Sequence, residues 1–88
     1  MSDEDIAQEI VRQLSRRAAD SSICPSEVAR TLQSDETAWR ALMPQVRAVA
    51  AAMQDSGLLR ISRGGVEVPR KALHRGAIRL KRGPAFGP

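Results

Sequence analysis

Aromatic residues, cysteine and histidine are nearly absent from this sequence of 88 residues. Because Trp39 and Phe86 are the only aromatic side chains, the core has to be built from aliphatic residues and alanine, and single-stranded nucleic acid finds no row of rings to stack on. One cysteine, Cys24, cannot form a disulfide within the chain, and with a single histidine, His74, it cannot complete a zinc site. We therefore expect a compact helical core, a reducing environment and no bound metal.

Long apolar runs and a cationic leader are also lacking. The longest strongly apolar stretch, around residues 46–53, contains Arg47 and is far shorter than a membrane span. The acidic first segment, residues 1–5, is the opposite of a secretory leader. The sequence contains no set of nucleophile, base and orienting residue and no cofactor motif. We expect a cytoplasmic protein that is not an enzyme, binds no cofactor and does not associate with membranes.

Charge is distributed unevenly along the chain. Residues 1–44 carry five arginines against eight Asp and Glu, a net charge of −3, whereas residues 45–88 carry nine Arg and Lys against two acids, a net charge of +7. Clustered cations attract polyanions, which makes nucleic acid or another acidic partner the first candidate. The alternative is that these cations only keep the protein soluble.

The hydrophobic pattern predicts three helices. Apolar residues recur at helical spacing over residues 3–18, 25–33 and about 44–55. Ser2 suits an N-cap, and Pro25 and Pro44 each suit the first position of a helix, with one separate helical turn before Pro44. On the first helix a polar face is expected to be solvated: Gln8, Glu9, Arg12, Gln13 and Arg16.

After Gly57 the hydrophobic period changes from about 3.6 to two, which predicts a β-hairpin. Gly64-Gly65 forms its turn, and the register pairs Arg63 with Val66, Ser62 with Glu67 and Ile61 with Val68. In this register one face carries Leu59, Ile61, Val66 and Val68.

Two further segments complete the expected organisation. A short extended segment at Ile23 is expected to pair against the hairpin. Residues 70–88 carry six cations and several Gly and Pro, so we interpret them as a basic, partly docked tail following a domain of residues 1–69.

Three helices followed by a hairpin is the element order of a winged helix-turn-helix, and this fold class is mainly α with a small β-hairpin as the wing. The predicted core combines one face of each element: Ile6, Ile10, Leu14, Val28, Leu32, Trp39, Val46, Val49, Met53, Leu59 and Ile61.

Four stretches carry a family resemblance: Ile23–Arg30, Trp39-Arg40 with Met43–Arg47, Gly57–Ile61, and Arg75–Leu80. In these stretches, and from about Ile6 to Arg82 as a whole, the sequence resembles a bacterial family known as domain of unknown function 3253. Members of that family often have Pro between the Gly and the Ile of the last stretch, where Ala77 stands here. The resemblance implies a winged-helix fold and assigns no activity, ligand or catalytic residue.

Candidate nucleic-acid contacts lie in the third helix, the hairpin and the tail. If the third helix enters a major groove, Gln45, Arg47, Ala48 and Ala51 face the bases, although alanines offer no hydrogen bonds. Cations of the hairpin and tail would contact phosphates without reading sequence. The predicted contacts with double-stranded DNA are Gln45, Arg47, Arg60, Arg63, Arg70, Lys71, Arg79 and Arg82.

The alternative function is a non-catalytic protein-interaction module, in which the third helix or the acidic first helix docks a partner. The two functions differ in surface charge, because DNA binding requires Arg47, Arg60 and Arg63 on one continuous basic face. In both interpretations Cys24 has a structural role.

Overall fold

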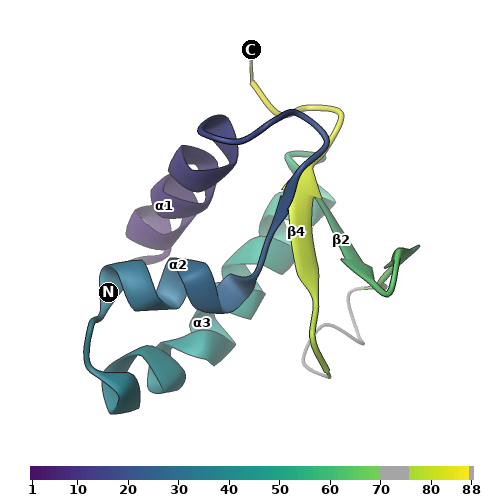
Figure 1. Ribbon diagram of the computed structural model, residues 1–88. Helices are drawn as coiled ribbons and strands as arrows, with labels where there is room; N and C mark the ends of the chain where they lie inside the picture. The colour runs from purple at the N-terminus through teal and green to yellow at the C-terminus, as the bar shows by residue number, and fades with distance from the viewer. Residues whose placement is uncertain (70–75, 88) are drawn as a thin grey trace.

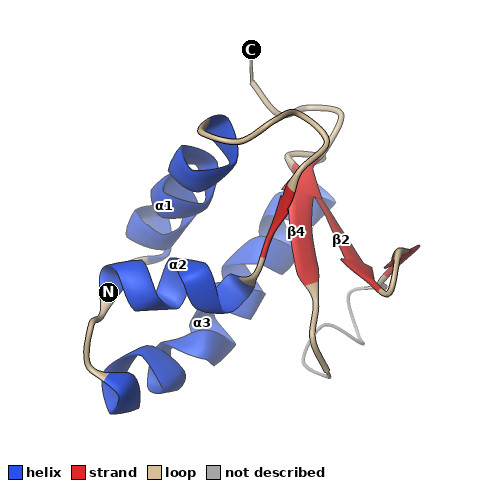
Figure 2. Cartoon of the chain, in the orientation of Figure 1, coloured by secondary structure: helices blue, strands red, loops and turns tan. Residues whose placement is uncertain are grey.

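The computed structural model describes residues 1–69 and 76–87. It contains three helices, α1 (Asp3–Ser15), α2 (Pro25–Leu32) and α3 (Glu36–Asp55). Its antiparallel sheet has the strand order β1-β4-β2-β3, formed by β1 (Ser22–Ile23), β2 (Leu59–Arg63), β3 (Val66–Glu67) and β4 (Arg79–Arg82). Figures 1 and 2 show the helices gathered on one side and β2 and β4 side by side on the other. The fold is mainly α with a small sheet and is compatible with a winged-helix-like architecture.

The first two helices begin where their capping residues predict. Ser2 Oγ accepts a hydrogen bond from Asp5 N at 3.1 Å, and Asp5 Oδ2 accepts one from Ser2 N at 3.3 Å, so α1 starts with a reciprocal capping box. At α2, Glu27 Oε2 accepts a hydrogen bond from Cys24 N at 2.9 Å, with Pro25 as the first helical residue. These bonds satisfy backbone donors that a helix start leaves without partners.

Helix α3 is longer than the sequence predicts. It runs without interruption from Glu36, so the prediction of a third helix starting at Pro44 is wrong. Asp35 caps the earlier start, accepting a hydrogen bond from Ala38 N at 3.0 Å. Pro44 removes one backbone donor, but the buried residues Leu42 and Val46 on either side of it hold the two halves against the same core.

The predicted hairpin register is confirmed. Arg63 pairs with Val66 and Ser62 with Glu67, and Val68 N donates to Ile61 O at 2.8 Å. The turn glycines have φ of 58° and 84°, the left-handed values that a two-residue type I′ turn requires. Val66 is an exception to the predicted buried face, because it lies at the tip of the hairpin and is 70% exposed.

Strand β4 was not predicted, and it corrects two expectations. It lies between β1 and β2, so Ile23 pairs with Leu80 instead of with the hairpin. Ile78 and Leu80 are 1% and 0% exposed, so this part of the predicted tail belongs to the core of the domain. A boundary after residue 69 therefore does not separate a domain from a docked tail.

The predicted core is confirmed apart from two residues at its margin. Nine of the eleven predicted core residues are buried, whereas Leu32 and Trp39 are only partly buried against them. The Trp39 ring is covered by two guanidinium groups, with Arg30 at 4.6 Å and Arg40 at 4.7 Å from the ring centre. The core gains several residues beyond the predicted set: Ile23, Ala29, Leu42, Ala50, Ala51, Val68, Ile78 and Leu80.

Two residues of the supposedly solvated face of α1 are buried against α2, which contradicts the sequence prediction. Glu9 and Gln13 are each 9% exposed. Gln13 Nε2 donates to Glu9 Oε2 at 2.8 Å and to Thr31 Oγ1 at 3.2 Å, which links the two helices. The hydrogen bond from Arg12, at 2.9 Å from its Nε, lowers the pKa of the Glu9 carboxyl group below its ordinary value, although burial acts in the opposite direction.

Candidate nucleic-acid interface

The pairing of β2 with β4 brings three cations together on the face of the sheet that points away from the helices. Arg60 lies opposite Lys81, and Ser62 lies opposite Arg79. Residues directly opposite one another in an antiparallel pair share a face, and alternate residues along each strand point the other way. Ile61, between Arg60 and Ser62, is fully buried, so the face with the cations is the solvent side.

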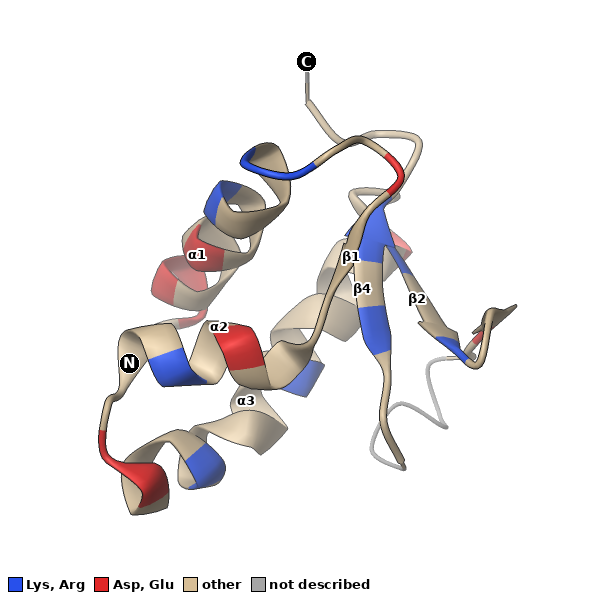
Figure 3. Cartoon of the chain, viewed as in Figure 1, with Lys and Arg blue, Asp and Glu red and all other residues tan. Residues whose placement is uncertain are grey.

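We call this surface the outer sheet face and define it by Ser22, Arg60, Ser62, Glu67, Arg79 and Lys81. Its three cations are exposed, and Figure 3 shows blue segments along β2 and β4. A shallow depression of about 270 Å³ lies here, with Arg60, Lys81 and Glu67 among its lining residues. The outer sheet face is therefore an accessible, predominantly basic surface.

On the outer sheet face, like charges repel one another when no anion is bound. Arg60 and Lys81 carry like charges at directly opposite positions, an arrangement that destabilises a sheet. Within the described ranges the salt bridges involve Arg12, Arg17 and Arg40, and none involves a cation of this face. An anion lying across the two strands would relieve the repulsion.

Arg79 is held in a fixed position on this face. Its Nε donates to Ser22 Oγ at 3.0 Å and its Nη2 donates to Ser22 O at 2.9 Å. Both bonds cross from β4 to β1, so one edge of the guanidinium is anchored on the sheet while the residue as a whole remains exposed. Less side-chain entropy is then lost when Arg79 contacts a ligand.

Arg47 and Arg63 lie elsewhere, beside the segment that leads into β4. Arg47 Nη2 donates to Gly76 O at 3.1 Å. The Arg63 side chain packs against the same glycine. If Gly76 carried a Cβ atom, that atom would lie 3.2 Å from Arg63 Nε. Because Arg63 is three positions from Arg60 on one strand, the two side chains leave opposite faces. A continuous basic face of Arg47, Arg60 and Arg63, which the sequence makes the requirement for DNA binding, is therefore not formed. Arg60 shares a basic face with Arg79 and Lys81 instead.

Arg82 and Gln45 were also predicted to contact DNA, but their side chains form hydrogen bonds within the domain. Arg82 Nη2 donates to Leu14 O and Arg17 O, both at 3.0 Å, so it caps the carboxyl end of α1 from β4. Gln45 Nε2 donates to Met1 O and Asp3 Oδ1, both at 2.9 Å, which ties α3 to the start of α1.

The remaining predicted contacts lie on α3 and in the segment after residue 69. Ala51 is 6% exposed, so it does not face a ligand, whereas Ala48 on the same helix is exposed. Arg70 and Lys71 lie outside the described residues.

Ser22 belongs to the outer sheet face but was not among the predicted contacts, and Lys81 was predicted only as one of the cations of the hairpin and tail. A period of two over residues 78–81, with Ile78 and Leu80 apolar and Arg79 and Lys81 basic, is the signal that could have identified a strand with one basic face. The contribution of Ser22 depends on the pairing of β1 with β4, which no local pattern contains.

Residues 1–69 and 76–87 offer little to other kinds of site. No group of three or more His, Cys, Asp or Glu side chains there is arranged to hold a metal ion. Cys24 is half-buried, and its Sγ accepts a hydrogen bond from Ser26 Oγ at 3.1 Å. Of the helices described, none is both long enough and apolar enough to cross a membrane.

Comparison with known families agrees with the resemblance seen in the sequence. The family model described as protein of unknown function (DUF3253) matches residues 3–83, and the chain belongs to this family. The match includes β4, in agreement with the position of this strand inside the domain. Among curated proteins, none matches the chain.

Proposed function

We propose that this member of the DUF3253 family is a winged-helix module that binds duplex DNA through its phosphates, with the outer sheet face as the main contact surface. The observation that carries the proposal is the exposed, directly opposed pair of Arg60 and Lys81, with Arg79 anchored beside it. A phosphate between these side chains replaces a repulsive interaction with charge-assisted hydrogen bonds. Phosphate contacts of this kind position a protein on DNA without reading its sequence.

Helix α3 offers little for reading bases. Its exposed surface includes Ala48 and Ala52, and the amide of Gln45 already bonds to the start of α1. Base recognition in the major groove depends on side chains such as Arg, Asn or Gln that form paired hydrogen bonds. We therefore expect an affinity that differs little between DNA sequences.

Duplex DNA is favoured over single strands because of the position of the two aromatic rings. Trp39 is covered by Arg30 and Arg40, and Phe86 lies 4.9 Å from the guanidinium carbon of Arg82. Neither ring belongs to the outer sheet face, so bases have no stacking platform there.

We also propose a cytoplasmic location, since an unpaired cysteine suits a reducing compartment.

The proposal is tested by fluorescence anisotropy with two unrelated duplexes at low salt. The double variant Arg60→Gln/Lys81→Gln should bind both duplexes about tenfold more weakly, since two phosphate contacts are lost. The control Arg16→Gln/Arg40→Gln removes the same formal charge from exposed positions just after α1 and on α3, and should change the affinity less than about twofold. Equal losses for both variants, or no binding by the unmodified protein, would contradict the proposal.

A further inference from the structure

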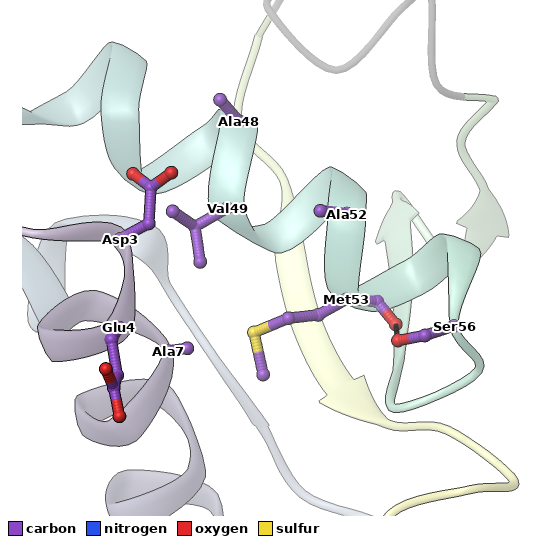
Figure 4. A pocket seen from close by; sticks show the side chains of 8 residues that line it. All are labelled: Asp3, Glu4, Ala7, Ala48, Val49, Ala52, Met53 and Ser56. Atoms are coloured by element: carbon purple, nitrogen blue, oxygen red, sulfur yellow. Dashed lines mark hydrogen bonds between the residues drawn. The ribbon is translucent and has the colours of Figure 1, made fainter.

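A groove between α1 and α3 offers a second surface, separate from the outer sheet face. It has a volume of about 390 Å³, and Figure 4 shows the side chains of the two helices that line it. Its floor is apolar and consists of Ala7 from α1 and four residues from α3: Ala48, Val49, Ala52 and Met53. Three of these five residues are alanines. Because their side chains are small, the backbone of a bound partner can approach the floor of the groove closely.

The apolar surface continues beyond the groove along α1. Val11 lies one helical turn after Ala7, on the same side of the helix, and is 38% exposed. Val49 and Met53 are each 6% exposed and connect the floor with the core. A row of apolar side chains on a partner would therefore find a continuous apolar surface.

The rim of the groove is acidic. Asp3 and Glu4 stand at the groove, in the first turn of α1. Their carboxylates accept hydrogen bonds from neutral amides, Asp3 from Gln45 at 2.9 Å and Glu4 from Gln8 at 3.4 Å. No salt bridge within residues 1–69 and 76–87 neutralises either of them.

We infer that this groove docks a cationic amphipathic helix of a partner protein, with its apolar face on the alanine floor and its Lys or Arg side chains against Asp3 and Glu4. A helix fits because both walls are helices, which offer no unpaired backbone edge to a partner strand. A symmetric dimer through the same groove is disfavoured, since it would bring the acidic rims of two copies together. The inference does not depend on DNA binding.

The first experiment titrates the full chain, labelled with ¹⁵N, with three synthetic peptides of about 15 residues. The test peptide has leucines on one helical face and lysines elsewhere; one control replaces the leucines by serine, and the other replaces the lysines by glutamate. The test peptide should shift the amide signals of Ala7, Ala48 and Ala52, and both controls should bind at least about tenfold more weakly. Equal binding of all three peptides, shifts confined to other elements, or no binding of the test peptide would overturn the inference.

Variants of the protein locate the contact. Ala52→Gln places a long side chain on the floor and should weaken binding of the test peptide at least about tenfold, whereas Ala41→Gln, an exposed position of α3 outside the groove, should leave it unchanged. Asp3→Asn/Glu4→Gln should weaken binding about threefold or more, and Asp20→Asn, exposed outside the groove, should not. Unchanged binding by Ala52→Gln, or concentration-dependent dimerisation of the unmodified chain that Ala52→Gln abolishes, would contradict docking of a partner helix.

Discussion

Arginine side chains in this protein have different roles although their formal charge is the same. Arg82 caps the end of α1, Arg79 is anchored to Ser22, and Arg30 and Arg40 cover the Trp39 ring. The role of each arginine follows from the groups around its guanidinium.

The role of Arg82 can be tested by substitution. Arg82→Gln removes charge-assisted hydrogen bonds to Leu14 O and Arg17 O and should lower the free energy of unfolding by about 1–3 kcal/mol in urea denaturation. Lys81→Gln is the matched control on the same strand. It removes a like charge opposite Arg60, so it should leave stability unchanged or raise it slightly. A stability loss as large for Lys81→Gln as for Arg82→Gln would show that Arg82 has no special structural role.

Glu9 should make stability depend on pH. Its pKa is lowered in the folded protein, chiefly by the hydrogen bond from Arg12, so its contribution is fully present above the ordinary pKa of the carboxyl group and is lost as the pH falls through the lowered value. The free energy of unfolding, measured by urea denaturation between neutral pH and acid, should therefore decrease below about pH 4.5. Glu9→Gln should show a smaller decrease over this interval. An identical pH profile for the two proteins would rule out Glu9 as a source of the acid sensitivity.

At the scale of the elements, the turn after β4 is closely packed against the segment before β2. Gly83 N donates to Leu58 O at 2.9 Å, and Ala85 N donates to Gly57 O at 2.9 Å. A Cβ on Gly83 would collide with Gly57 O and would lie 2.8 Å from Leu59 N, so this position has no room for a side chain. Gly83 therefore determines the path of the chain after β4.

Gly83→Ala should therefore lower the free energy of unfolding by about 2 kcal/mol or more, because backbone atoms cannot move aside as a flexible side chain can. Gly87→Ala, where an added Cβ meets nothing within 4 Å, should have no measurable effect. Thermal denaturation of the two variants checks the difference, and equal melting temperatures would contradict the close packing described for Gly83.

The elements also differ in how far the sequence predicts them. The helices and the hairpin depend on local signals, namely capping residues, apolar periodicity and the glycine pair, and all of them form. Strand β4 is only four residues long, and its place between β1 and β2 comes from long-range pairing. The start of α3 was predicted wrongly because Pro44 was expected to interrupt the helix. The energetic penalty of this proline is offset by the packing of Leu42 and Val46, which no local sequence signal reveals.

At the scale of the whole molecule, the charge asymmetry of the sequence becomes only partly a separation of surfaces. Figure 3 shows acidic and basic segments together on the helices, and basic segments along β2 and β4. The sequence predicts the excess of cations in the second half of the chain but not the faces to which they point. Arg60 and Arg63 illustrate the reason, since a shift of three positions along a strand reverses the side of the sheet.

Binding of DNA phosphates by the cations of the outer sheet face can be tested without disturbing the fold. Removing residues from Arg70 onward is not a suitable test, because it would also remove β4 from the middle of the sheet. Substitutions at exposed positions leave the fold in place. With one phosphate contact for each of Arg60, Arg79 and Lys81, the logarithm of the binding constant should fall against the logarithm of the salt concentration with a slope of about −3.

The most direct measurement is this salt dependence for the unmodified protein and for Arg60→Gln/Lys81→Gln, by anisotropy with one random-sequence duplex. The slope of the double variant should be smaller in magnitude by about two, because two phosphate contacts are lost. The same slope in both proteins, with or without a change in affinity, would mean that Arg60 and Lys81 do not contact the DNA phosphates.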